Sequence, residues 1–222
     1  METKLLNQPV LYNYFRSSTS VRVRIGLNLK GIDYKYVSLH LRKKEHQTEE
    51  YLKINPYGLL PAIEFPSGIK LNQSLAILEY LDEIYPTPSI IPINPMERAK
   101  VRSMAYAIAL EIHPLNNLHV LNYLKEDLAL DDLGIKNWFS KWVHKAFMPF
   151  ENILQNDKDT GIYCFGDTPT LVDICLFAQV VNNARFEVDM TSYPKINSVY
   201  KACLNNKAFY DALPKNQPDA ES

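Results

Sequence analysis

The sequence predicts two domains, an α/β domain followed by an all-helical domain. In the first third of the 222-residue chain, apolar and polar residues alternate at residues 10–14 and 34–39, as in half-buried strands. Further along, apolar residues instead recur every three or four positions, as on one face of a helix. A segment with four prolines separates the two patterns. We therefore expect an α/β domain at residues 1–87, a linker at 88–95 and an all-helical domain at 96–222.

The first strand leads directly into a helix. Four hydroxyl residues at 17–20 follow the strand at 10–14, and such residues are typical helix N-caps. Lys30-Gly31 is a common signal for the end of a helix. The alternation at residues 22–29 is also compatible with a strand, but the signals at both ends favour a helix. Together with the strand at 34–39, this segment forms a βαβ unit, whose strands are parallel.

A hairpin and a further helix complete the first domain. A short helical patch near residues 51–53 precedes the hairpin, whose strands at 59–65 and 69–71 flank Pro66-Ser67-Gly68. Pro61 stands at the start of the first of these strands, where it either forms a cis peptide bond or marks a sheet edge. Ser74 is expected to cap the next helix, which gives the order β-α-β-α-β-β-α.

The second domain carries three apolar stripes with helical spacing. The stripes are Val101, Met104, Ala105, Ile108 and Ile112; Trp138, Trp142, Val143, Phe147 and Phe150; and Leu171, Ile174, Cys175 and Ala178. His113-Pro114 is expected to kink or end the first of these helices. Thr170 and Asp173 have the spacing of a capping box, in which Asp173 builds a helix and contacts no ligand. The polar tail at 214–222 is expected to be loose.

Charge and composition argue against several classes of partner. The 24 basic and 25 acidic residues give a net charge of -1 with no long run of one sign, so nucleic acids and membranes are not expected partners. No apolar stretch approaches the roughly 18 residues that span a bilayer, and the first residues lead into no signal-peptide core, so we expect a cytoplasmic protein. Cys164, Cys175 and Cys203 lack C-x-x-C spacing, and we expect buried free thiols and no metal site.

The junction between the first strand and the first helix is a candidate binding site. A helix N-terminus presents free backbone N–H groups and the positive end of the helix dipole. With several hydroxyl donors beside it, this junction suits an anion such as a carboxylate or a thiolate. Hydroxyl residues that only cap the helix are the alternative explanation.

Several motifs together resemble one protein family. Residues 14–18 read Tyr-Phe-Arg-Ser-Ser, residues 22–25 Arg-Val-Arg-Ile, residues 73–77 Gln-Ser-Leu-Ala-Ile, residues 112–118 Ile-His-Pro-Leu-Asn-Asn-Leu and residues 185–189 Arg-Phe-Glu-Val-Asp. The match extends from Val10 to Pro218 and resembles the zeta class of cytosolic glutathione transferases, which comprises maleylacetoacetate isomerases and bacterial maleylpyruvate isomerases. The resemblance implies the glutathione transferase fold, with a thioredoxin-like N-terminal domain and an all-α C-terminal domain.

The resemblance also implies a glutathione-dependent cis–trans isomerase. In this family the sulfur of glutathione adds to the cis double bond of a small dicarboxylic substrate, the resulting single bond rotates, and glutathione is then eliminated. Glutathione is therefore a cofactor that each cycle regenerates. A free thiol with a pKa near ~8.5 is mostly neutral at pH 7, so hydrogen-bond donors and a positive helix end are needed to favour its thiolate. The family further implies a homodimer.

The resemblance assigns roles to the residues at matching positions. Ser17 is implied to hydrogen-bond the sulfur, with Ser18 and Thr19 in support, and Gln73 and Ser74 to bind the γ-glutamyl carboxylate. The remaining implied cofactor contacts are Leu60, Pro61, His46, His113 and Asn117. The implied substrate ligands are Arg16, Arg185 and His119, and the implied catalytic residues are Ser17, Ser18 and Arg16. Arginine suits a carboxylate because its guanidinium can donate two parallel hydrogen bonds. A surface or interdomain ion pair for Arg16 and a solvated or core ring for each histidine are the alternatives.

Two departures from the family pattern limit what the resemblance implies. Thr19 stands where zeta enzymes often carry a cysteine, so that position offers no thiol. His119 stands where bacterial relatives often carry an arginine, which leaves open whether maleylacetoacetate or maleylpyruvate is the substrate. A transferase or peroxidase that acts on electrophiles or α-halo acids, and a non-catalytic ligand-binding protein, remain alternatives.

Overall fold

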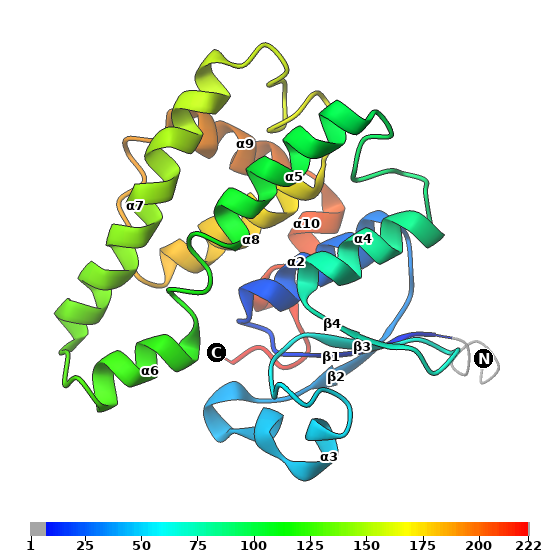
Figure 1. The fold of residues 1–222 in the computed structure, drawn as a ribbon, viewed down its shortest axis with the longest axis vertical. Helices are drawn as coiled ribbons and strands as arrows, with labels where there is room; N and C mark the ends of the chain where they lie inside the picture. Colours follow the sequence, from blue (N-terminus) through cyan, green and yellow to red (C-terminus); the bar gives the residue numbers. More distant parts are fainter. Residues whose placement is uncertain (1–7, 222) are drawn as a thin grey trace. The chain divides into compact units, whose positions relative to one another are not determined.

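The computed structural model describes residues 8–221 and divides into two compact units (Figure 1). The first unit comprises Met1–Ser89 together with Lys207–Ser222, and the second comprises Ile90–Asn206. The predicted second domain spans residues 96–222, whereas the structure groups the C-terminal segment with the first unit. The reason is non-local packing, since the segment's backbone carbonyls accept hydrogen bonds from side chains of the first helix.

The first unit contains a four-stranded mixed sheet with the strand order β2-β1-β3-β4. Strand β1 (Val10–Asn13) pairs parallel with β2 (Lys35–Ser38) and antiparallel with β3 (Ala62–Glu64). Strand β3 forms the predicted hairpin with β4 (Lys70–Asn72). The parallel pair follows from the helix that connects β1 to β2, because a crossover returns the chain in the same direction. The predicted α/β fold of this domain is confirmed.

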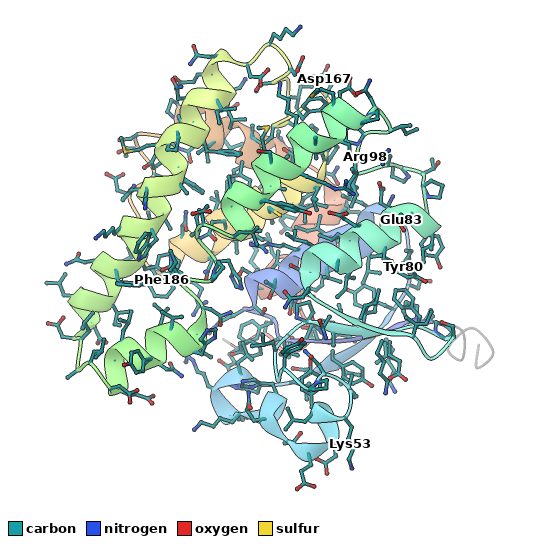
Figure 2. All side chains as sticks on the ribbon, in the orientation of Figure 1. Lys53, Tyr80, Glu83, Arg98, Asp167 and Phe186 are labelled. Atoms are coloured by element: carbon teal, nitrogen blue, oxygen red, sulfur yellow. The ribbon has the colours of Figure 1, made fainter. Side chains whose placement is uncertain are left out.

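The sheet is accompanied by the helices α2 (Ser18–Leu29), α3 (Glu49–Leu52) and α4 (Ser74–Ile84). Apolar side chains from α2, α4 and the sheet form one buried cluster, which consists of Leu11, Val23, Leu27, Ile63, Phe65, Ile77 and Leu81. Tyr80 of α4, labelled in Figure 2, packs edge-on against Phe65 with 5.1 Å between ring centroids. A Cβ atom at Gly26 would lie 2.1 Å from Leu78 Cδ2, so a larger residue there would displace the Leu78 side chain where α2 packs on α4.

The C-terminal segment folds back onto the first unit. It contains helix α10 (Lys207–Asp211) and the 3-10 helix η3 (Pro214–Asn216). The Asn28 side chain of α2 donates to the carbonyl of Ala208 at 2.9 Å. The side-chain amide of Gln217 donates to the carbonyls of Asp211 at 2.7 Å and Leu213 at 2.9 Å, which closes the tail on itself. The prediction of a loose tail is therefore wrong for its described residues.

The second unit is helical, as predicted. Its helices are α5 (Pro95–Ala109), α6 (Leu118–Glu126), α7 (Asp132–Asn156), α8 (Leu171–Ala184) and α9 (Pro194–Leu204). Helix α8 is buried over almost its whole length, and the capping box of Thr170 and Asp173 at its start is confirmed. Helix α5 ends at Ala109, before the His113-Pro114 pair that was expected to end or kink it. Within the described part of the chain, no helix is long and apolar enough to span a membrane.

Candidate functional site

Ser17 occupies the N-cap of α2 and connects the strand to the helix. Its backbone N–H donates to the carbonyl of Tyr14 at 3.0 Å, and its Oγ accepts a hydrogen bond from the backbone N–H of Ser20 at 3.3 Å. The extended backbone at Ser17 (φ -67°, ψ 118°) is the usual N-cap conformation. The Ser17 side chain is half-buried, whereas Ser18 is buried. The first turn of α2 therefore combines hydroxyl donors with the positive end of the helix dipole.

Thr19 joins this helix N-terminus to the segment that precedes β3. Its Oγ1 donates to the carbonyl of Leu60 at 3.0 Å and lies 2.9 Å from Ser17 Oγ. A threonine hydroxyl has a single hydrogen, and Leu60 takes it. Ser17 is then the donor in its contact with Thr19, so in this arrangement Thr19 acts on Ser17 as an acceptor.

The segment around Leu60 and the start of α4 bear further predicted site residues. The Leu60–Pro61 peptide bond is cis, which decides between the two predictions made for Pro61. Gln73 is exposed and holds a left-handed φ of 68°, and its carbonyl accepts from the N–H of Ile77. Gln73 therefore occupies the N-cap of α4, and the prediction that Ser74 caps the helix is wrong by one residue. A residue other than glycine at positive φ is conformationally costly, and such positions concentrate at functional sites.

Arg22, which was not among the predicted site residues, lies behind Ser74. Its guanidinium Nη1 donates to Ser74 Oγ at 3.4 Å, and both side chains are buried. Since Ser74 Oγ accepts from Arg22, its own hydroxyl hydrogen can be directed toward another acceptor. A buried positive charge next to a helix N-terminus also favours an anion there. The sequence offers one signal for this position, a charged residue between the apolar Val21 and Val23.

Arg16 and His46 lie elsewhere on the first unit. Arg16 Nη2 lies 3.6 Å from the Glu221 carboxylate, and its guanidinium stands over the Phe15 ring. His46 lies in the 3-10 helix η2 (Glu45–Gln47), and burial lowers the pKa of its ring. The buried Nδ1 of His46 has no hydrogen-bond partner among residues 8–221, so only Nε2 of this neutral ring is available to a ligand.

The predicted site residues of the second unit lie at helix ends. Asn117 precedes α6, with its side-chain amide 3.4 Å from His113 Nε2. His119 is exposed in the first turn of α6. Arg185 follows the last residue of α8, is exposed, and donates to the Asn182 side chain at 3.0 Å. Contact between His113 and Asn117 is thus established within this unit, whereas Arg185 and His119 stand on separate helices.

The cysteines are buried and reduced, as the sequence analysis expected. Burial raises the pKa of Cys164 and Cys203, and the charge of Asp173 acts in the same direction. Both thiols therefore stay protonated and chemically inert in the folded protein. Among the described residues, no cluster of three or more His, Cys, Asp or Glu side chains could hold a metal ion.

Two family models match the chain. The N-terminal domain of glutathione S-transferases matches residues 8–83, and the C-terminal domain matches residues 117–210. The mixed sheet and the helical second unit agree with these matches. The class of protein that the fold defines is therefore the glutathione S-transferase class.

More specific similarity comes from individual proteins. A maleylacetoacetate isomerase of Rattus norvegicus is 44% identical over 214 residues, which cover 96% of this chain and 95% of the relative. The holo structure of a maleylpyruvate isomerase, a bacterial zeta-class enzyme, superposes with a TM-score of 0.93 at 43% identity, covering 96% of this chain and 100% of the other. The structure of a maleylacetoacetate isomerase of Methylobacterium extorquens AM1 with bound malonate and glutathione superposes with a TM-score of 0.92 at 34% identity. The superposition covers 96% of this chain and 100% of the other. The chain belongs to the zeta class of glutathione S-transferases, the family of the maleylacetoacetate and maleylpyruvate isomerases.

Proposed function

We propose that this protein is a glutathione-dependent cis–trans isomerase that converts maleylacetoacetate or maleylpyruvate to its fumaryl isomer. The observation that carries the proposal is the hydroxyl cluster at the N-terminus of α2, in which Ser17 caps the helix and contacts Thr19 at 2.9 Å. Such a cluster suits a thiolate. Relatives named for both substrates are about equally similar to this chain, at 44% and 43% identity, so identity alone does not choose between the two substrates.

The residues of the first unit fit the sulfur end of glutathione. Bound glutathione supplies a nucleophilic sulfur that adds to the substrate's double bond, permits rotation and then leaves. Ser17 turns its hydroxyl from Thr19 to the sulfur and donates a hydrogen bond to the thiolate. Thr19 keeps its hydrogen on Leu60 and so holds the helix N-terminus against the segment that would pair with the cysteinyl backbone. Ser18 and the helix dipole favour the negative charge further.

The buried Ser74 and Arg22 fit the other, anionic part of the cofactor. In our proposal the γ-glutamyl carboxylate accepts from the Ser74 hydroxyl and from the free N–H groups of α4, with Gln73 beside it. Arg22 adds positive charge from behind Ser74. Pro61 fixes the backbone direction of Leu60, and the neutral His46 donates from Nε2 to the glycine end. His113 and Asn117 act as a hydrogen-bonded pair toward the cofactor.

Arginines are the proposed ligands of the substrate carboxylates. Arg16 lies in the loop between β1 and α2 and directly precedes Ser17, so a carboxylate bound by it would lie close to the reacting sulfur. Arg185 and His119 are both exposed, and each would contribute a side chain to a carboxylate of the substrate. The structure with bound malonate and glutathione supports this class of ligand for a relative that is 34% identical.

An isomerisation assay tests the proposal. The substrate analogue maleylacetone is followed spectrophotometrically with and without glutathione, and maleylpyruvate is compared in the same way. Turnover that requires glutathione but does not consume it supports the isomerase. Consumption of glutathione with an electrophile, an α-halo acid or a peroxide, without isomerisation, would support the transferase or peroxidase alternative. Glutathione binding without any turnover would support a non-catalytic protein.

We also infer a homodimer, which rests on the family alone. Size-exclusion chromatography with light scattering measures the mass in solution. A mass of one chain at micromolar concentration would contradict this inference without affecting the proposed reaction.

A further inference from the structure

The tail of the chain, residues 212–221, contacts the loop that leads into α2. The carboxylate of Asp219 accepts a hydrogen bond from the backbone N–H of Phe15 at 3.2 Å. It also accepts from the hydroxyl of Ser38 at 2.6 Å and from the hydroxyl of Tyr36. One carboxylate from the end of the sequence thus joins strand β2 to the loop two residues before Ser17.

The same loop is held from the other side by Arg24, a fully buried residue of α2. Its guanidinium donates to the carbonyl of Phe15 at 2.9 Å and to that of Tyr14 at 3.4 Å. It also donates to the carbonyl of Ala212 at 3.1 Å, in the tail itself. The loop and the tail are therefore attached to one rigid side chain.

These contacts determine the direction of the chain into the N-cap. Both the N–H and the C=O of Phe15 are bonded, to Asp219 and Arg24 respectively. The carbonyl of Tyr14, which Arg24 also contacts, accepts from the N–H of Ser17 at 3.0 Å. A rotation of the Phe15 peptide would therefore shift Ser17 relative to the first turn of α2.

An apolar contact reinforces the attachment. Ala220 packs against the buried cluster of Tyr14, Phe15, Tyr51, Leu60 and Ala62. This cluster contains both the loop before Ser17 and the Leu60 that accepts from Thr19. The tail thus contacts the two backbone segments whose separation sets the position of the Ser17 hydroxyl.

We propose that Asp219 is a positioning residue for Ser17, so that the C-terminal tail completes the thiol-activating loop of the first unit. The inference rests on the proposed function, because it assumes that Ser17 donates to the glutathione sulfur. A donor stabilises an anion only when it is held within about 0.5 Å of the productive geometry. Asp219 supplies this constraint without touching glutathione or substrate.

The test compares Asp219→Ala and Asp219→Asn with the matched control Asp211→Asn. Asp211 lies in the same C-terminal segment and pairs with the exposed Lys207, away from the loop. The thiolate absorbance of bound glutathione is titrated against pH, and kcat is measured with maleylacetone. Both Asp219 variants should raise the pKa of the bound thiol by about one unit and lower kcat about tenfold, since small misplacement of a catalytic group is costly. The control should behave as the wild type does.

The outcomes separate positioning from general stability. A folded Asp219→Ala protein whose thiol titration and kcat lie within twofold of wild type would overturn the inference, even if its melting temperature fell. Should that variant fail to fold, the double variant Tyr36→Phe, Ser38→Ala decides, because it keeps the carboxylate but removes two of its donors. Without these two donors the carboxylate no longer holds the Phe15 N–H in one position, so the thiol pKa should rise as in the Asp219 variants. An unchanged titration would again overturn the inference. A wild-type protein that does not bind glutathione would instead refute the proposed function.

Discussion

Ser17 has two roles that mutation would separate, since it caps α2 and is the proposed donor to the sulfur. The variant Ser17→Ala should lose about 100- to 1000-fold in kcat, the scale of removing one preorganised donor. The loss of the cap should lower the free energy of unfolding by only about 1 kcal/mol. Steady-state kinetics with maleylacetone and a urea titration measure the two effects.

The control for Ser17 is another helix cap. Asp131 caps α7 by accepting from the N–H of Gly134 at 2.7 Å, in the second unit. Asp131→Ala should lose a similar amount of stability and keep its turnover. If Ser17→Ala retained kcat within a few-fold of wild type, then Ser18 or Thr19 would be the activating group instead.

Thr19 is expected to position Ser17 and the Leu60 segment rather than to donate to glutathione itself. Replacement by valine preserves the side-chain shape but leaves the Leu60 carbonyl without its donor and Ser17 without its acceptor. Because an unsatisfied buried carbonyl costs about 1–3 kcal/mol, the Leu60 segment is expected to shift in this variant. Such a shift of the proposed glutathione-binding segment should lower kcat/KM for glutathione roughly tenfold. Thr19→Ser keeps the hydroxyl and is the control, with activity near that of wild type. Equal activity of the valine variant would show that the link to Leu60 has no functional role.

The N-cap of α2 could be predicted from the sequence, whereas the burial of Arg24 could not. The hydroxyl cap was predicted correctly because a cap is a local signal, read within four residues. The burial of Arg24 could not be predicted, because its partner Ala212 is 188 positions away in the sequence. An arginine in a helix ordinarily lies at the surface, and the returning tail both covers this one and adds the Ala212 carbonyl to its local partners at Tyr14 and Phe15.

At the scale of elements, α7 and α9 are joined by a buried carboxylate. Glu151 of α7 accepts from the backbone N–H groups of Lys195 at 2.8 Å and Ile196 at 2.9 Å, in the first turn of α9. The Glu151 carboxylate thus satisfies free donors at a helix N-terminus and interacts favourably with its dipole. This cap was missed because its members are more than forty residues apart, whereas the Thr170 and Asp173 box lies within four residues.

Removal of the Glu151 carboxylate should lower the free energy of unfolding. Glu151→Ala leaves two N–H groups without an acceptor, and we expect a loss of about 3 kcal/mol in the free energy of unfolding, measured by urea titration. Asp132→Ala on the same helix is the control, because its ion pair with Lys125 is exposed, and its unfolding midpoint should not change. A Glu151→Ala midpoint equal to that of wild type would mean that water replaces the carboxylate at no cost.

The predicted strands, hairpin and helices were correct because their periodicity and end signals are local. The tail is the exception among elements. Its prolines and polar residues resemble a disordered segment, but Gln217 and Asp219 bond to specific backbone groups. The composition of a segment shows how polar it is. It does not show which partners its side chains meet in the fold, so these hydrogen bonds could not be predicted from the sequence.

At the scale of the whole molecule, several buried acids keep their protons in the folded state. Burial raises the pKa of the thiols Cys164 and Cys203 and of the phenols Tyr36 and Tyr51. The unfolded chain exposes these groups, which then ionise near their ordinary pKa values, about 8.5 for a thiol and about 10 for a phenol. The folded state therefore binds more protons than the unfolded state at alkaline pH, and its stability must fall as pH rises.

Ionisation of the thiols should account for most of the stability that is lost just above pH 8, because a thiol ionises at lower pH than a phenol. Their contribution is fully present below about pH 8, and above the unfolded thiol pKa each protonated thiol costs about 1.4 kcal/mol per pH unit. Urea titrations under reducing conditions at pH 8, 9 and 9.5 should show a declining free energy of unfolding. In the double variant Cys164→Ala, Cys203→Ala, the starting stability is lower but the decline with pH should be shallower, because these two thiols no longer release protons on unfolding. Parallel declines in the variant and the wild type would show that these two thiols ionise as readily in the folded protein as in the unfolded chain.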